Sequence, residues 1–163
     1  MGAEPFTIRR ARADDAPALE RLAVASKRHW GYDAAFMERV RPALVPPREY
    51  LGNDLVFVAE TSDGAAVGFY GFKRREGEVF LEDMWVEPGR IGTGLGRMLW
   101  NHAVETARSA GYRSFEIESD PNAEPFYLHC GAQRAGEMIS PATGRVVPLL
   151  RFELGEPRPA ERT

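Results

Sequence analysis

Apolar residues recur at two different periods along this chain, and each period predicts its own kind of element. Alternating or short continuous apolar runs, typical of strands, fall at 6–10, 55–60, 66–74, 78–86, 112–119, 134–139 and 146–153. Helical spacing is found at about 15–28, 34–43, 94–111 and 123–130. The order βααβββαβαββ predicts an α/β domain with a mixed, mostly antiparallel central sheet of about six to seven strands, flanked by about four helices.

The boundaries of these elements carry recognisable signals. Asp14 or Asp15, followed by Pro17, predicts the start of the first helix, and the prolines of RPALVPP are expected to stop the second. The turn segments TSDG and REG separate three consecutive strands, which predicts an antiparallel meander. Residues 1–155 are expected to form one domain, whereas the polar tail 156–163 has too little to bury and is expected to be disordered.

Composition narrows the classes of partner. The 163 residues carry 21 basic and 24 acidic side chains, and a net charge of −3 gives no broad footprint for nucleic acid or an anionic membrane. Neither is expected as a partner, and a homodimer is left open. The cytoplasm is the expected location, because the single Cys130 cannot form an internal disulfide and the sequence shows no secretory leader and no apolar run of about 18 residues.

Three glycines at every second position stand out in VEPGRIGTGLGRMLW, residues 86–100, between a predicted strand and a predicted helix. A glycine-rich loop at a helix N-terminus offers free N–H donors and the positive end of the helix dipole, which suits a phosphate group. The alternative is a tight connection without a ligand. A P-loop is excluded because Gly96 is followed by Arg97 and Met98, and the dinucleotide fingerprint fails because neither 97 nor 99 is glycine.

The loop resembles the pyrophosphate loop of the GNAT superfamily, the acyl-CoA dependent N-acyltransferases, through Val86-Glu87-Pro88 and Gly94-Leu95-Gly96. The segment ESDPNAEPFYLHCGAQRAGE, 118–137, is similar to the strand and helix that follow in that family. The order of elements also matches over nearly the whole chain. The resemblance implies the GNAT fold and an N-acetyltransferase that moves an acetyl group from acetyl-CoA to a primary amine by direct attack.

The resemblance also implies where the cofactor lies. Backbone groups near Trp85 and Val86 would pair with the pantetheine arm like an added strand, and Asn122 would hold the arm, with helix capping as the alternative role for Asn122. The pyrophosphate would lie on the loop Arg90, Ile91, Gly92, Thr93, Gly94, Leu95, Gly96 and Arg97. Ile91 stands where the family has Arg or Gln, so Arg90 and Arg97 are the candidates for the missing cation.

Acetyl transfer requires that the amine lose its proton, directly or through water. Glu82 and Asp83 are the candidate bases, and strand alternation predicts that only one of them points into a cleft. Glu82 is favoured because it matches a family site often occupied by a base; its alternative is an exposed carboxylate. The resemblance assigns the general acid to Tyr127, whose alternative role is that of a core aromatic residue.

The acceptor is predicted only in part. Trp30 and Tyr32 fall in the region that walls the acceptor cleft in such folds, and Arg145 is a candidate ligand for a carboxylate on the acceptor. A buried hinge and a solvated loop arginine are the alternatives. The acceptor is a small-molecule or peptide amine whose identity the sequence leaves open.

A non-catalytic acyl-CoA sensor of the same fold is the alternative function, and Ile91 is its best support. Glu82, Asn122 and Tyr127 together favour the enzyme. Cys130 is expected to be a small core residue rather than a nucleophile. The histidines at 29, 102 and 129 lack metal-site spacing, so no metal is expected.

Overall fold

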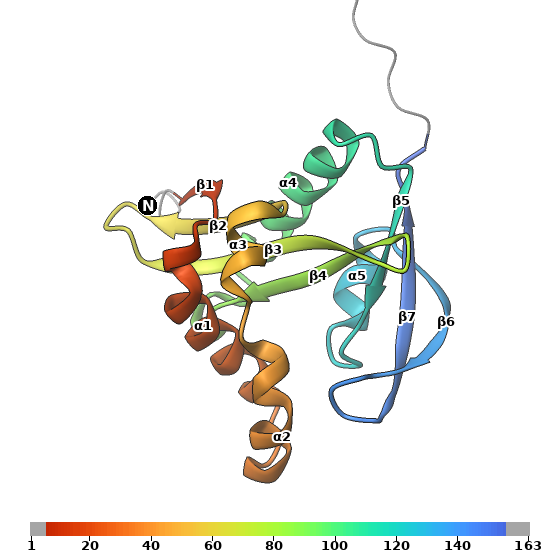
Figure 1. Ribbon diagram of the computed structural model, residues 1–163, viewed down its shortest axis with the longest axis horizontal. Helices are drawn as coiled ribbons and strands as arrows, with labels where there is room; N and C mark the ends of the chain where they lie inside the picture. The colour runs from red at the N-terminus through yellow and green to blue at the C-terminus, as the bar shows by residue number, and fades with distance from the viewer. Residues whose placement is uncertain (1–5, 156–163) are drawn as a thin grey trace, which may run out of the picture.

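The computed structural model describes residues 6–155, which form a twisted sheet with helices on both faces (Figure 1). The expected tail, 156–163, lies outside the described residues. The seven strands are β1 (Phe6–Arg10), β2 (Val56–Thr61), β3 (Ala66–Arg75), β4 (Glu78–Val86), β5 (Ser114–Glu118), β6 (Gln133–Ile139) and β7 (Val146–Glu153). The α-helices of this part of the chain are α1 (Ala16–Arg28), α2 (Ala34–Leu44), α3 (Arg48–Asn53), α4 (Leu95–Ser109) and α5 (Glu124–His129).

The sheet has the order β1-β2-β3-β4-β5-β7-β6. Every neighbouring pair is antiparallel except β4 and β5, which run parallel and are joined by the crossover through α4. This confirms the predicted mixed, mostly antiparallel sheet and the meander of β2, β3 and β4.

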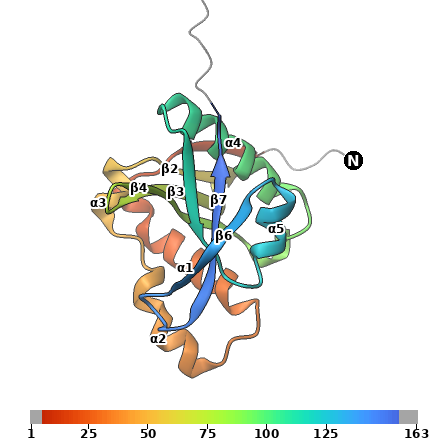
Figure 2. The same ribbon diagram turned by 90° about the vertical axis from the view of Figure 1, so that its right-hand side faces the viewer.

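Two apolar clusters form the core, one on each face of the sheet. Leu19, Phe36 and Tyr50 belong to the cluster under α1, α2 and α3, whereas Leu99 and Trp100 belong to the cluster under α4 and α5. Figures 1 and 2 show α1 and α2 on one side of the strands and α4 on the other. Apolar positions at helical spacing in α1 and α4 make these packed layers possible.

Two details of the helical region differ from the expectation. The prolines were expected to stop the second helix, but Pro42 lies inside α2, whose end is at Leu44 just before Pro46 and Pro47. Helix α3 was not predicted, because six residues after a Pro-Pro pair are too few to show a helical period. Tertiary contacts hold α3 in place, since its Tyr50 and Leu51 are buried.

The sheet opens between β4 and β5. Their register contains a single pair, Phe80 with Glu116, and beyond it the two strands diverge (Figure 1). On the other side of β4 the register with β3 shifts between Gly71 and Phe72, so that β4 carries one extra residue, Glu82, at a bulge. A side chain at position 71 would collide with the Tyr50 hydroxyl, which explains the glycine beside this bulge.

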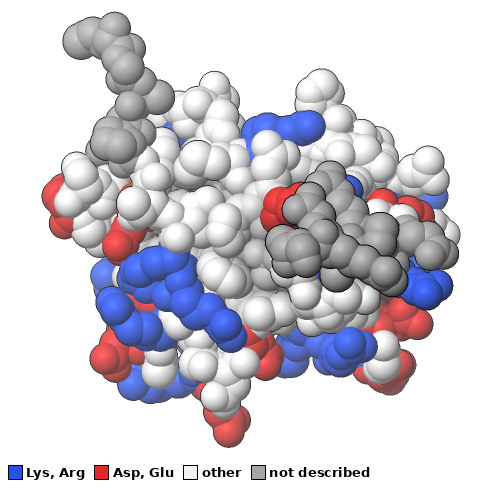
Figure 3. All heavy atoms as spheres, turned by 90° about the horizontal axis from the view of Figure 1, so that it is seen from above, with Lys and Arg blue, Asp and Glu red and all other residues white. Residues whose placement is uncertain are grey.

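Charges of both signs are mixed on the face seen from above, where acidic and basic side chains lie side by side around an uncharged centre (Figure 3). Within residues 6–155, none of the helices has the length and apolar character needed to cross a bilayer.

Candidate active site

Two cavities flank the opening between β4 and β5. The α2 pocket, of about 660 Å³, extends from the opening toward α2 and the β6–β7 turn. The glycine-loop pocket, of about 380 Å³, extends toward the start of α4. The residues that line both pockets, and so mark their junction, are Leu81, Glu82, Trp85, Glu118 and Asp120.

The glycine-loop pocket brings together most of the residues predicted to hold the cofactor. The predicted residues that line it are Trp85, Val86, Ile91, Gly92, Gly94, Gly96, Arg97 and Asn122. Arg90, Thr93 and Leu95 do not line it: Arg90 pairs with Glu87, the Thr93 hydroxyl donates to the Arg90 carbonyl at 2.5 Å, and the Leu95 side chain is buried.

The start of α4 offers backbone donors to this pocket. Gly92 and Gly94 have left-handed backbone, with φ of +82° and +92°, which other residues adopt only under strain. The first bond of the helix runs from the Met98 N–H to the Gly94 carbonyl, so the N–H groups of Leu95, Gly96 and Arg97 precede any acceptor within the helix. These three donors and the helix dipole form a cradle for an anion.

Of the two arginines proposed to replace the cation missing at Ile91, only Arg97 lines the glycine-loop pocket. Its guanidinium donates to the Cys130 sulfur at 3.4 Å. Ile91 itself is 45% exposed at the pocket wall. The cationic candidate is therefore on the first turn of α4 and not at the usual loop position.

The residues expected to wall the acceptor cleft separate in the structure. Tyr32 and Arg145 line the α2 pocket, whereas Trp30 lines the glycine-loop pocket. The reason is the chain reversal after α1, where Gly31 has a φ of +83° and sends the rings of Trp30 and Tyr32 to different sides. Trp30 and Tyr32, both expected in the region that walls the acceptor cleft, therefore line different pockets.

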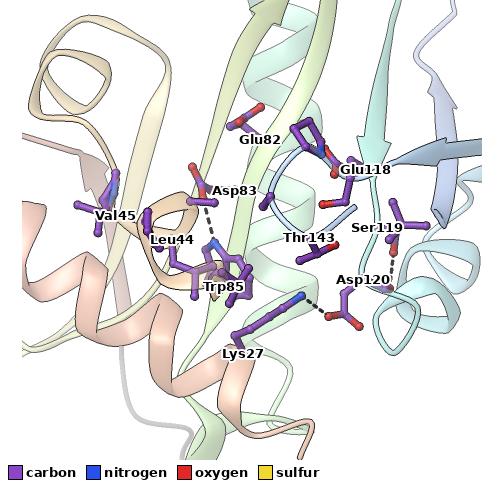
Figure 4. A pocket seen from close by; sticks show the side chains of 18 of the residues that line it. Lys27, Leu44, Val45, Glu82, Asp83, Trp85, Glu118, Ser119, Asp120 and Thr143 are labelled. Atoms are coloured by element: carbon purple, nitrogen blue, oxygen red, sulfur yellow. Dashed lines mark hydrogen bonds and ion pairs between the residues drawn. The ribbon is translucent and has the colours of Figure 1, made fainter. Parts of the chain in front are cut away.

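A buried ion pair crosses the mouth of the opening. Lys27 of α1 donates to Asp120, which follows β5, at 2.5 Å, and the two side chains are only 13% and 10% exposed (Figure 4). The Tyr32 hydroxyl donates to the same carboxylate at 2.8 Å, and the Asn122 side-chain amide donates to it at 2.9 Å. Burial opposes ionisation, but the bond and charge of Lys27 outweigh it and lower the pKa of Asp120.

Both candidate bases line the α2 pocket, although strand alternation predicted that only one of them would point into a cleft. The bulge at Glu82 is the physical reason, because an extra residue interrupts the alternation of side chains along β4. Arg75, at the end of β3, binds Glu82 at 2.8 Å and Glu118 of β5 at 2.8 Å. It therefore joins the two strands where their backbones have separated.

Asp83 has a different environment from Glu82. It forms no ion pair with any residue of the described range 6–155, and it accepts a hydrogen bond from the Trp85 indole at 2.9 Å (Figure 4). The buried Tyr50 hydroxyl lies close enough to lower the pKa of Asp83, but it has no hydrogen-bond partner of ordinary geometry among the described residues. Burial raises the pKa of Asp83 to about 6, although the groups of Trp85 and Tyr50 oppose the rise.

Tyr127 of α5 lines the glycine-loop pocket and is 7% exposed. Its ring packs against those of Trp100 and Phe126 at centroid distances of 5.9 and 5.3 Å. Burial raises the pKa of its hydroxyl, and the nearby acidic groups of Cys130 and Asp83 raise it further. The phenol is therefore protonated at neutral pH.

Several residues that the fold brings to the junction or near it were not predicted from the sequence. Asp120 lies within the segment 118–137 and Lys27 within the predicted helix at about 15–28, but neither side chain was singled out. Arg75 and Tyr50 lie in no motif. Among residues 6–155, no cluster of three or more His, Cys, Asp or Glu side chains is arranged to hold a metal ion.

Comparison with known proteins agrees with this architecture. Residues 17–132 match the family model of the acetyltransferase (GNAT) family. The aminoglycoside N(6')-acetyltransferase type 1 of Stenotrophomonas maltophilia is 32% identical over 123 residues, which cover 64% of this chain and 79% of that protein.

Solved structures are similar over nearly the whole chain. A GCN5-related N-acetyltransferase from Rhodopseudomonas palustris superimposes with a TM-score of 0.75 at 19% identity, over 94% of this chain and 97% of that one. The structure of yncA from Salmonella typhimurium with its cofactor acetyl-CoA gives a TM-score of 0.64 at 22% identity, over 98% and 99%. Because the family model spans well over half of the sequence, this chain belongs to the acetyltransferase (GNAT) family and is an N-acetyltransferase.

Proposed function

We propose that this enzyme transfers the acetyl group of acetyl-CoA to a primary amine by direct attack. The observation that carries the proposal is the junction, where Glu82, Trp85 and Asp120 line both pockets and where a donor in one pocket would meet an acceptor in the other. The related yncA structure, which contains acetyl-CoA, supports this choice of donor.

The glycine-loop pocket fits the donor. The N–H groups of Leu95, Gly96 and Arg97 would bind the pyrophosphate, and the Arg97 guanidinium would add a positive charge. Backbone groups near Trp85 and Val86 lie on the part of β4 that β5 no longer pairs with, so they are available to the pantetheine arm. Bound in this way, acetyl-CoA supplies a thioester carbonyl at the junction.

Asn122 lines the same pocket, and its side-chain amide already donates hydrogen bonds within the protein. It donates to Asp120 at 2.9 Å and to the Tyr32 hydroxyl at 3.1 Å. We expect it to hold Asp120 and Tyr32 in place while contacting the arm, which differs from the simple capping role.

The base that the sequence favoured was Glu82, but the environment of Asp83 supports Asp83 more strongly. The Glu82 carboxylate is bound by Arg75, whereas the Asp83 carboxylate has no such partner within residues 6–155. With a pKa of about 6, Asp83 is ionised at neutral pH yet basic enough to accept a proton from the acceptor ammonium, directly or through water. Glu82 is the competing candidate.

Tyr127 is the proposed acid. Its hydroxyl would give a proton to the CoA thiolate as the thioester breaks, and its raised pKa keeps that proton in place before the reaction. The nitrogen of the tetrahedral intermediate would release its second proton to solvent as the amide forms, after which Asp83 would lose its proton to solvent and Tyr127 would regain one from it.

The experiment that tests this function is a thiol-release screen with acetyl-CoA and diverse amines, paired with calorimetric measurement of acetyl-CoA binding. Aminoglycosides belong in the screen because the relative from Stenotrophomonas maltophilia is an aminoglycoside acetyltransferase. We expect tight binding and amine-dependent release, with release lowered by roughly 10²- to 10⁴-fold in Asp83→Asn. Binding without release for every amine would instead favour the acyl-CoA sensor that Ile91 suggested.

A further inference from the structure

The charges that line the α2 pocket are mostly neutralised by one another. Four carboxylates and four cations line it: Glu82, Asp83, Glu118, Asp120, Lys27, Lys73, Arg75 and Arg145. Arg75 is bound to Glu82 and Glu118, and Lys27 is bound to Asp120. These five side chains hold the protein together at the junction, and because Arg75 is shared by two carboxylates they keep one net negative charge.

Three charges remain for a ligand, namely those of Asp83, Lys73 and Arg145. None of the three forms an ion pair with another residue in the range 6–155. All three line the α2 pocket and not the glycine-loop pocket, and Asp83 is next in sequence to Glu82, which lines both. The pocket therefore has a free acid on the strand that carries the junction and free cations from β3 and the β6–β7 turn.

Arg145 is held in position by aromatic rings. Its guanidinium lies 5.6 Å from the centroid of Tyr32 and 5.4 Å from that of Phe36. The two rings are stacked on each other at 4.2 Å. The turn that carries Arg145 is also anchored, because Ala142 packs against the apolar cluster under α1, α2 and α3.

From this distribution of charge we infer that the acceptor is a primary amine that also carries a carboxylate, with its amine directed to Asp83 and its carboxylate bound by Arg145 and Lys73. This rests on the proposed function of the same site. Guanidinium binds carboxylate through paired, charge-assisted hydrogen bonds, and a lysine adds a second positive charge. A polycation gains nothing from these two side chains and is repelled by them.

The expected acceptor differs from that of the related aminoglycoside acetyltransferase, because aminoglycosides are polycations. Polycation binding would require carboxylates that are free to pair with ammonium groups. In this pocket three of the four carboxylates are already bound by Lys27 or Arg75.

The test uses amines that differ only by a carboxylate: tyrosine and tyramine, histidine and histamine, lysine and cadaverine, with kanamycin as the polycation. We expect kcat/KM for the carboxylated member to exceed that of its partner by about tenfold or more, and kanamycin to be a poor acceptor. Calorimetric binding of each amine to the CoA-loaded protein provides a readout that does not depend on turnover.

Two variants locate the effect. Arg145→Gln and Lys73→Gln should raise KM for the carboxylated amines and leave KM for their partners nearly unchanged, with little change in kcat. Arg108→Gln is the matched control, because Arg108 is on α4, pairs with Glu105 and lines neither pocket. This split between the two kinds of acceptor would not arise from a merely structural loss.

The inference is overturned if kanamycin or the decarboxylated amines are preferred, or if both variants keep the wild-type preference. It is also overturned if no carboxylated amine binds or reacts. Thiol release with amines but without a carboxylate preference would refute the inference alone, whereas a protein that does not bind acetyl-CoA would refute the proposed function.

Discussion

The pH dependence of the reaction offers a direct test of Asp83. A base must be ionised to accept a proton, so kcat/KM should fall on the acid side with the pKa of the base. Burial raises the pKa of Asp83 to about 6. At pH 7.5 nearly all of the carboxyl is then ionised, whereas at pH 5 only about a tenth is, so kcat/KM should be about tenfold below its plateau.

Asp83→Asn keeps the shape of the side chain but cannot accept the proton. We expect turnover to fall by roughly 10²- to 10⁴-fold, the usual contribution of a general base, and the acid limb near pH 6 to disappear. Glu82→Gln is the matched control on the neighbouring residue. Glu82→Gln should reduce turnover less than Asp83→Asn does, and its pH–rate profile should retain the acid limb near pH 6.

Stability provides the check that Asp83→Asn is folded. The folded pKa of Asp83 lies above the unfolded value of 3.8, so its ionisation opposes folding, and this cost grows as the pH rises from about 4 to 6. At pH 7 the variant should be at least as stable as the wild type, with an upper bound to the gain of about 3 kcal/mol from the size of the shift. Thermal melting and initial rates would be measured on one preparation.

The assignment would be refuted if Asp83→Asn kept an acid limb near pH 6, or if Glu82→Gln abolished that limb while Asp83→Asn remained active. A wild-type limb near pH 4, where ordinary carboxyl side chains titrate, would contradict the buried environment of Asp83 as its cause.

Other variants test the rest of the site. Arg75→Met should move the acid limb to higher pH, because it removes a charge that lowers the pKa of Asp83 and leaves the charge of Glu82 unopposed; a pH–rate profile with an unchanged limb would contradict this. Tyr127→Phe should lower kcat by at least about tenfold with acetyl-CoA affinity intact, and steady-state turnover equal to the wild type would exclude Tyr127 as the acid. Gly94→Ala should weaken acetyl-CoA binding in calorimetry and lower stability by about 1 kcal/mol. The cause is backbone strain at a φ of +92°, since no atom lies within 4 Å of the added methyl group, and unchanged affinity would show that the loop does not bind the donor.

Local patterns in the sequence determined most of the secondary structure of this protein. Period-2 and period-3.6 spacing predicted the seven strands and four of the five α-helices of the described range, because core-facing residues recur at the period of the element that buries them. The loop around Gly94 and the segment with Tyr127 carried the family resemblance, since a turn and a helix start depend on adjacent residues.

Only the tertiary structure decided how the candidate site is arranged. Alternation along β4 could not reveal that Glu82 and Asp83 share a pocket, because the bulge depends on the register with β3. The helix that buries Tyr50 is too short to have a period of its own.

The ion pairs that set the charge of the site join distant parts of the chain. Lys27 and Asp120 are 93 residues apart, and Arg75 and Glu118 are 43 apart. No local spacing predicts such pairs, because their partners lie on different elements. They come close only when the folded sheet places β3, β4 and β5 side by side and α1 next to the end of β5. The elements therefore follow from short-range periodicity, whereas the choice of base and the charges left for the acceptor follow from long-range packing.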